Sequence, residues 1–143
     1  MESPPTRGSG GNARGAAEKI YATGSYWFAA AAMAASIATL KLIRESDYLE
    51  QITAMGGSLR TGLNDRASAH GFTVRQTGPA QMPLILFDED PDMRLGYAWS
   101  ASMVRHGVYM HPWHNMFISA AMTDANIAFA LDAADQSFAE LAK

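Results

Sequence analysis

The sequence predicts an α+β fold in which helices cover a mostly antiparallel sheet, preceded by a long alanine-rich helix. Its 143 residues are a length typical of one domain. Hydrophobic residues make up 48% of the chain and charged residues 17%, which is enough apolar material for a sizeable core. The apolar spacing predicts the order helix, helix, strand, strand, helix, strand, strand, helix. Because short loops join the strands of each pair, the layered α+β arrangement follows.

The N-terminal part combines a flexible segment with the alanine-rich helix. Residues 1–15 are rich in Pro, Gly, Ser and Arg and predict a flexible segment. A helix follows over residues 28–44. It has no polar face between Phe28 and Thr39, so we expect it to pack against protein on most sides. Because alanine dominates the run over residues 26–43 and Lys41 lies near its end, the pattern favours a buried helix over a membrane span.

A second helix is expected over residues 47–70. Asp47 and Glu50 have the spacing of a capping box. Apolar residues then recur at steps of three and four up to Leu63, and Gly71 marks the C-terminal stop. Glycines within this helix lower its propensity, so close packing must compensate for them: Gly56, Gly57 and Gly62.

The remaining elements follow from alternation and capping signals. Strands are expected over residues 72–77 and 83–87, then a helix that Asp90 caps and Gly107 ends. Two more strands are expected over residues 108–111 and 116–121, and Thr123 caps a last helix.

Charge and composition exclude several function classes. The net charge of −3 and the pI near 5.7 remove the electrostatic reason to expect nucleic acid or an anionic membrane as partner. The absence of cysteine excludes disulfides and thiolate chemistry. No secretory signal pattern is present, and we expect a cytoplasmic protein.

The stretch YMHPWHNMFIS contains two of the four histidines, His111 and His114, on either side of Trp113. Three interpretations are open: a metal site, histidines that hydrogen-bond locally, or a loop that lines a binding pocket. Zinc needs at least three protein ligands, and neither cysteine nor a third suitably spaced histidine accompanies this pair. We therefore expect no metal.

The stretch TGSYWF places Gly24 and Ser25 just before the alanine-rich helix. Free N–H groups at a helix start beside a hydroxyl suit a phosphate, although an ordinary serine cap has the same pattern. No nucleophile–base pair stands out, so the residues themselves assign no catalytic group.

Three stretches follow one another along the chain: TGSYWFAAAAMAASIATLKLI, YLEQITAMGGSLRTGLNDRASAHGFTVRQTG and SMVRHGVYMHPWHNMFISAAMTDANIAFALDAADQSF. In this order they resemble the C-terminal part of class III aminotransferases, the pyridoxal-phosphate (PLP) enzymes of fold type I. Within that family they resemble the glutamate-1-semialdehyde aminomutase-like branch. The resemblance implies that residues 16–45 form the end of the large domain with its connecting helix. Residues 46–143 then form the C-terminal small domain of fold type I.

The resemblance also implies roles for individual residues. Gly24 and Ser25 match the Gly-Thr pair that reaches across the family's dimer interface to the phosphate of the partner subunit's PLP. Serine keeps the hydroxyl of the usual threonine. The loop with His111, Trp113 and His114 matches the substrate entrance. His114 stands about where the aminomutases carry a glutamate, which favours a general amine transaminase over the aminomutase reaction.

The resemblance implies that the Schiff-base lysine belongs to a preceding stretch. The lysines present are Lys19, Lys41 and Lys143, and none lies in a segment like the family's catalytic-lysine stretch. We expect a part of a transaminase that needs a cofactor-binding domain or a homodimer partner to act on a small amine and a keto acceptor. The alternative is a non-catalytic binding or assembly module with the same fold.

Overall fold

The computed structural model describes residues 15, 18–20 and 24–143. Contacts within the chain divide it into two compact units, Met1–Lys41 and Leu42–Lys143. Residues 1–14 of the segment expected to be flexible lie outside the described residues.

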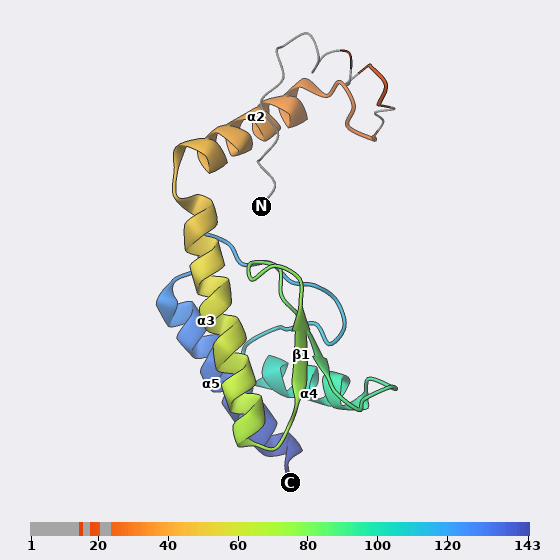
Figure 1. The fold of residues 1–143 in the computed structure, drawn as a ribbon, viewed down its shortest axis with the longest axis vertical. Coiled ribbons are helices and arrows are strands. Elements are labelled where there is room, and N and C mark those ends of the chain that lie inside the picture. The colour runs from red at the N-terminus through yellow and green to blue at the C-terminus, as the bar shows by residue number, and fades with distance from the viewer. Residues whose placement is uncertain (1–14, 16–17, 21–23) are drawn as a thin grey trace, which may run out of the picture. The chain divides into compact units, whose positions relative to one another are not determined.

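Helix α2 (Ala30–Glu45) is the alanine-rich helix (Figure 1). It begins two residues later than expected, because Phe28 has a φ of 64° in the left-handed region, where a right-handed helix cannot start. Alanine has the highest helix propensity, so the helix can form with little support from packing. None of its residues is buried and Ile37 is 55% exposed, so the expected buried helix is wrong within this chain. Its packing against other protein stays a prediction.

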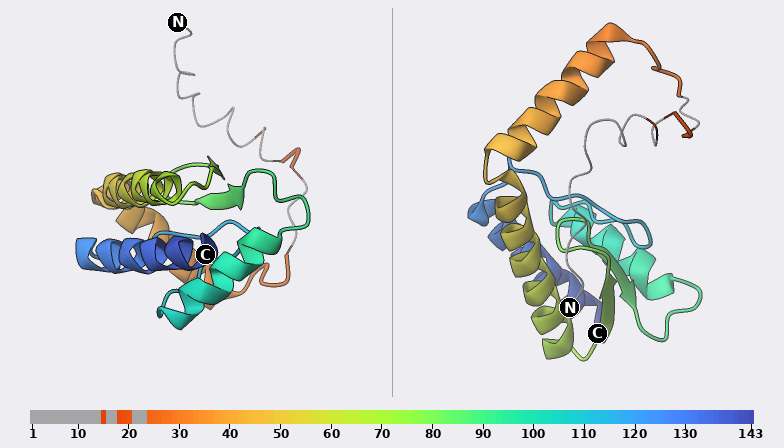
Figure 2. Two further views of the ribbon diagram at one scale, coloured as in Figure 1. Left: turned by 90° about the horizontal axis from the view of Figure 1, so that it is seen from below. Right: turned by 45° about the horizontal axis from the view of Figure 1, so that its top comes forward.

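Three helices form the framework of the second unit: α3 (Tyr48–Ala69), α4 (Arg94–Arg105) and α5 (Asp124–Leu141). Helices α3 and α5 run side by side in the same direction, and α4 packs against α5 (Figures 1 and 2). Their facing apolar residues build the core with the hairpin, and the largest fully buried members are Trp99, Phe138, Leu63 and Met103. The Trp99 ring stacks on Phe138 with centroids 5.4 Å apart.

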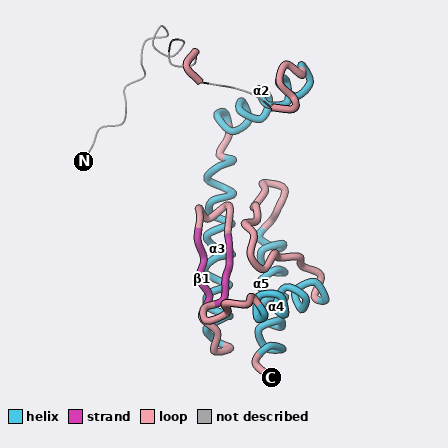
Figure 3. The backbone as a smooth tube through the Cα atoms, turned by 90° about the vertical axis from the view of Figure 1, so that its right-hand side faces the viewer, coloured by secondary structure: helices cyan, strands magenta, loops and turns pink. Residues whose placement is uncertain are grey.

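Strands β1 (Val74–Thr77) and β2 (Leu84–Phe87) form an antiparallel hairpin that Figure 3 shows beside α3. Val74 pairs with Phe87 and Thr77 with Leu84. Gly78, with a φ of 81°, begins the turn in a conformation that glycine adopts without strain. The predicted α+β class and the hairpin are confirmed.

The two further strands predicted over residues 108–111 and 116–121 are wrong. Within the described chain the sheet has two strands, and both segments are loops. The amides of Met116 and Ile118 donate to the carbonyls of Pro83 and Gln81, each at 2.9 Å. Proline has no N–H to return the bond, so the reciprocal pairing of an antiparallel ladder cannot form at Pro83. The mostly antiparallel sheet is therefore smaller than expected.

The helix starts differ in how they are capped. Asp47 makes no cap hydrogen bond; its Oδ1 accepts from Gln51 Nε2 at 2.8 Å, so the capping box predicted with Glu50 is wrong. Thr123 does cap α5, in a reciprocal capping box with Asn126.

Among the residues that the structure describes, no helix has the length and the hydropathy needed to cross a bilayer.

Candidate functional site

Gly24 and Ser25 lie in an exposed turn before α2. The Trp27 amide donates to the Gly24 carbonyl at 3.1 Å and closes the turn. Helix α2 begins only at Ala30, so Ser25 neither caps it nor lies at its start. The serine-cap interpretation and the helix-start argument for a phosphate are therefore both wrong. Within the described residues the Ser25 hydroxyl has no hydrogen-bond partner. A Cβ built on Gly24 would meet nothing within 4 Å, so a ligand can approach the backbone there.

This turn fits a phosphate. The amides of Ser25 and Tyr26 donate to no other described group. Two N–H donors and a free hydroxyl on consecutive residues are the donors that phosphate oxygens accept from. Gly24 and Ser25 could therefore hold the phosphate of PLP.

The loop with His111, Trp113 and His114 belongs to the second unit and is fixed to α4 at three points. The buried Ser100 hydroxyl donates to the Met110 carbonyl at 2.7 Å. Pro112 is buried against Gly96, where an added Cβ would lie 3.4 Å from the proline ring. Trp113 Nε1 donates to the Tyr97 hydroxyl at 2.9 Å. Because these contacts hold its backbone and its indole, the loop presents a defined surface.

The two imidazoles have complementary hydrogen-bonding roles. His111 Nδ1 accepts from the Trp113 amide at 3.3 Å, so its proton is on Nε2 in the neutral ring. His114 Nδ1 lies 2.9 Å from the Asn115 carbonyl oxygen and donates to it, so its Nε2 carries the lone pair. The loop therefore offers one donor and one acceptor to a ligand.

The rings of this loop pack edge to face around His111. Its centroid lies 4.8 Å from that of Trp113, 5.6 Å from that of His114 and 6.2 Å from that of Tyr109. Among the described residues no group of three His, Cys, Asp or Glu side chains is arranged to hold a metal ion. Local hydrogen bonding and a pocket-lining position are both compatible with this geometry.

An apolar groove of about 290 Å³ adjoins the loop. Tyr109 and Met110, which directly precede His111, form part of its wall. The rest of the wall comes from Leu59 of α3, from Pro83, from the segment around Phe117 and from the first turns of α5, including Phe129. The side chains of His111, Trp113 and His114 are not among the residues that line the groove.

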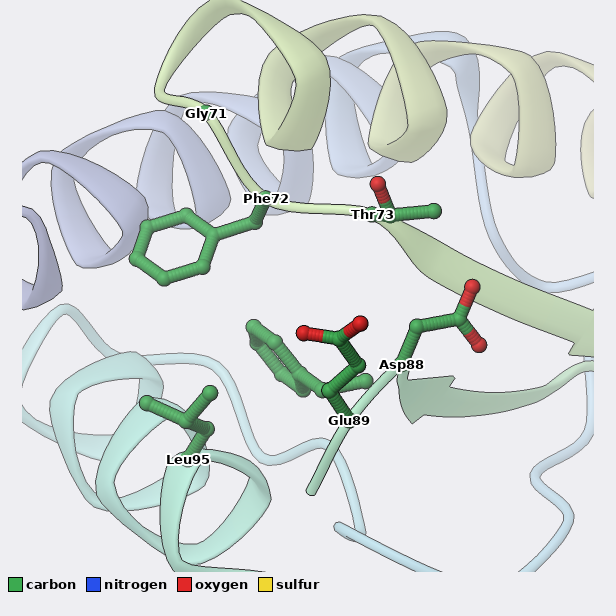
Figure 4. Close-up of a pocket in the computed structure, with 7 residues that line it drawn as sticks. Gly71, Phe72, Thr73, Asp88, Glu89 and Leu95 are labelled. Carbon is green, nitrogen blue, oxygen red and sulfur yellow. The ribbon is translucent and has the colours of Figure 1, made fainter.

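A second cavity, of about 660 Å³, lies beyond the C-terminal ends of α3 and β2 (Figure 4). Its lining residues are Gly71, Phe72, Thr73, Phe87, Asp88, Glu89 and Leu95. Asp88 Oδ1 is already paired with Arg75 Nε at 3.1 Å. The lining includes no histidine, lysine or arginine.

One charged cluster escaped the sequence analysis. Three donors at the C-terminal end of α4 converge on the Glu140 carboxylate: the Ser102 hydroxyl at 2.6 Å, Arg105 at 2.6 Å and His106 at 3.0 Å. The Ser102 hydrogen bond, followed by those of Arg105 and His106, lowers the pKa of Glu140 from 4.5 to about 2. The donors are 34 to 38 residues from Glu140, so no local spacing pattern could have found the cluster.

The chain is similar to PLP-dependent enzymes over most of its length. It is 53% identical over 126 residues to the aminopentol aminotransferase of Sphingopyxis macrogoltabida, which covers 88% of this chain and 30% of that protein. It is 30% identical over 136 residues to the glutamate-1-semialdehyde 2,1-aminomutase of Anaeromyxobacter sp. (strain Fw109-5); this match covers 87% of this chain and 32% of that protein. No family model matches the chain.

The fold agrees with these relatives. The PLP internal aldimine form of the FumI protein of Sphingopyxis sp. MTA144 superposes with a TM-score of 0.80 and 52% identity, over 90% of this chain and 31% of that one. The chain is homologous to the C-terminal part of class III PLP-dependent aminotransferases. It spans about 30% of the length of these relatives. The resemblance deduced from the sequence is therefore confirmed at the level of this partial homology.

Proposed function

We propose that the chain supplies the small domain and the phosphate-facing turn of a PLP-dependent aminotransferase, which transfers an amino group between an amine and a carbonyl acceptor. The free donors around Ser25 are the observation that carries the proposal, together with the homology to aminotransferases. PLP, when bound, supplies the electron sink for this chemistry. His114 stands about where the aminomutases carry a glutamate. We therefore propose amino transfer from a general amine, and not the aminomutase reaction.

The lysines of the chain do not fit the cofactor's aldehyde. A lysine that forms the imine must be desolvated and held in a formed pocket to be a ready nucleophile. Lys19, Lys41 and Lys143 are all exposed. We therefore propose that the reactive lysine comes from a cofactor-binding part outside these residues. Gly24 and Ser25 serve a phosphate held by that part or by a second subunit. The cytoplasmic location stays a prediction.

Complementation tests this function. The chain is mixed or co-expressed with the remaining part of the aminopentol aminotransferase that is 53% identical to it. We expect retained PLP and amino transfer from an amine to a keto acid only when both parts are present. In the complex, Ser25→Ala should weaken PLP binding by about 1 kcal/mol, the net value of one hydrogen bond.

Ser36→Ala is the matched control, because Ser36 lies exposed on α2 and bonds only to the Ala32 carbonyl. Equal PLP affinity in the Ser25 and Ser36 variants would remove Ser25 from the phosphate site. Borohydride reduction of the chain alone with PLP should give scattered, substoichiometric labelling. Stoichiometric labelling of one of its lysines would contradict the assignment of the reactive lysine to another part. Assembly without amino transfer would favour the alternative, a non-catalytic module.

A further inference from the structure

We propose that the cavity beyond the C-terminal ends of α3 and β2 binds an organic cation, a quaternary ammonium group. Its volume of about 660 Å³ is within the range of small-molecule sites. Every residue of its lining belongs to the second unit, and neither the turn at Gly24 and Ser25 nor the histidine loop contributes to it. Binding there is therefore independent of the proposed amino transfer.

Two aromatic rings form a corner of this cavity. Phe72 and Phe87 both line it, with ring centroids 5.7 Å apart and ring planes at 84° to each other. The core holds both rings in place, since the fully buried Phe138 ring lies 5.9 Å from each of them. The face of an aromatic ring is negative and attracts a cation that lies within about 6 Å of its centre. The corner therefore suits a positive group with an apolar surface.

The Glu89 carboxylate supplies the charge. Figure 4 shows it pointing toward the Phe72 ring, whereas the Asp88 carboxylate points away from that ring. Asp88 is paired with Arg75, but within the described part of the chain Glu89 has no hydrogen-bond or ion-pair partner. Because the lining contains no basic side chain, nothing in the cavity wall offsets this negative charge. The charge favours a cation and disfavours an anion.

The other lining groups select the kind of cation. Calcium and magnesium take six or more oxygen ligands, and among the described residues no three acidic or histidine side chains are grouped to hold a metal ion. A primary ammonium has three N–H donors that each need an acceptor. A quaternary ammonium has no N–H, and its methyl groups can contact Phe72, Phe87 and Leu95 while its charge faces Glu89. Aromatic faces are the usual binding surface for this group.

Binding of choline to the full chain tests the inference. Choline has a quaternary ammonium, and 3,3-dimethylbutan-1-ol is its matched neutral control, because a carbon replaces the nitrogen at the same shape. Both are titrated at constant ionic strength and followed by NMR. We expect choline to bind at least about tenfold more tightly, through the combined attraction of the ring faces and the carboxylate. Its methyl protons should show contacts to the Phe72 ring.

Three variants separate the cavity from the general charge of the segment. Glu89→Gln should weaken choline binding about three- to fivefold and leave the neutral alcohol unchanged. Phe72→Leu keeps an apolar side chain without the ring face and should weaken choline by a similar factor. Asp92→Asn is the matched control, because Asp92 is an exposed acid three residues from Glu89 that does not line the cavity. It should change the choline affinity less than about twofold.

Equal affinities of choline and the neutral alcohol would overturn the inference. So would an Asp92→Asn effect as large as that of Glu89→Gln, because the charge would then act without the cavity. Glu89→Gln changes an exposed side chain without a partner, so a loss of choline binding in a variant with unchanged melting temperature reports the site and not the fold. Choline contacts confined to other aromatic residues would also refute the assignment.

Discussion

Adjacent glycines of α3 should respond in opposite directions to the same substitution. A Cβ on Gly57 would meet nothing within 4 Å, whereas a Cβ on Gly56 would overlap the Ala80 carbonyl and lie 2.9 Å from the Gln81 amide nitrogen. The obstacle at Gly56 is the backbone of the turn that follows β1, and a backbone cannot rotate away as a side chain can. Gly56→Ala and Gly57→Ala therefore form a matched pair.

The magnitudes follow from propensity and packing. Alanine is about 0.8–1 kcal/mol better than glycine inside a helix, so Gly57→Ala should stabilise the fold by roughly that amount. Forcing a methyl group into a packed site costs about 1–3 kcal/mol. Gly56→Ala should therefore be destabilised by up to about 2 kcal/mol after the propensity gain. For a unit of this size each kcal/mol moves the melting temperature by about 4–8 °C.

Thermal and urea unfolding followed by circular dichroism measure both variants. Gly62→Ala should fall between them, since its Cβ would lie 2.6 Å from Leu131 Cδ1, the end of a flexible side chain. If Gly56→Ala and Gly57→Ala stabilise the protein equally, α3 does not pack on the turn around Ala80. The packing explanation for the glycines would then be wrong.

Three further predictions concern charge, association and capping. Glu140→Gln should lower the urea midpoint at pH 7. The pKa of Glu140 is depressed from its ordinary value of 4.5 to about 2, so the ionised carboxylate stabilises the fold fully above pH 4.5. This stabilisation is lost as the pH falls through about 2. The urea midpoints of Glu140→Gln and the parent should therefore converge at that pH. Ile37→Glu should reduce dye binding and concentration-dependent association in sedimentation, because Ile37 is an exposed apolar residue of a helix with no buried residue; a monomeric parent chain would contradict this. Asp90→Ala should destabilise the fold by about 1 kcal/mol through the loss of its bonds to the first amides of α4, and an unchanged urea midpoint would show that water replaces them.

The buried helix faces and the C-terminal ends of α3 and α4 could be predicted because their causes are local, whereas the starts of α2 and α4 were displaced from the predicted positions. Apolar residues at helical spacing in α3 and α5 identify the faces that are buried. Gly71 and Gly107, with φ values of 81° and 84°, follow the ends of α3 and α4 as expected. The N-cap of α4 is Met93 and the helix begins at Arg94, so the cap predicted at Asp90 is wrong. The Asp90 carboxylate still accepts the amides of Leu95 and Gly96 in the first turn of α4.

The strands predicted over residues 108–111 and 116–121 show what periodicity cannot report. Met110 and Ile118 are buried while their neighbours Tyr109 and Phe117 are exposed, so the segments alternate as strands do. Alternation records which side chains face the core, but a sheet also needs a partner with free N–H and C=O groups along its length. Pro83 accepts a hydrogen bond from the Met116 amide but has no N–H to donate in return. In the irregular backbone that results, the rings of His111, Trp113 and His114 lie 4.8 to 6.2 Å from one another, whereas a strand would place the neighbours Trp113 and His114 on opposite faces.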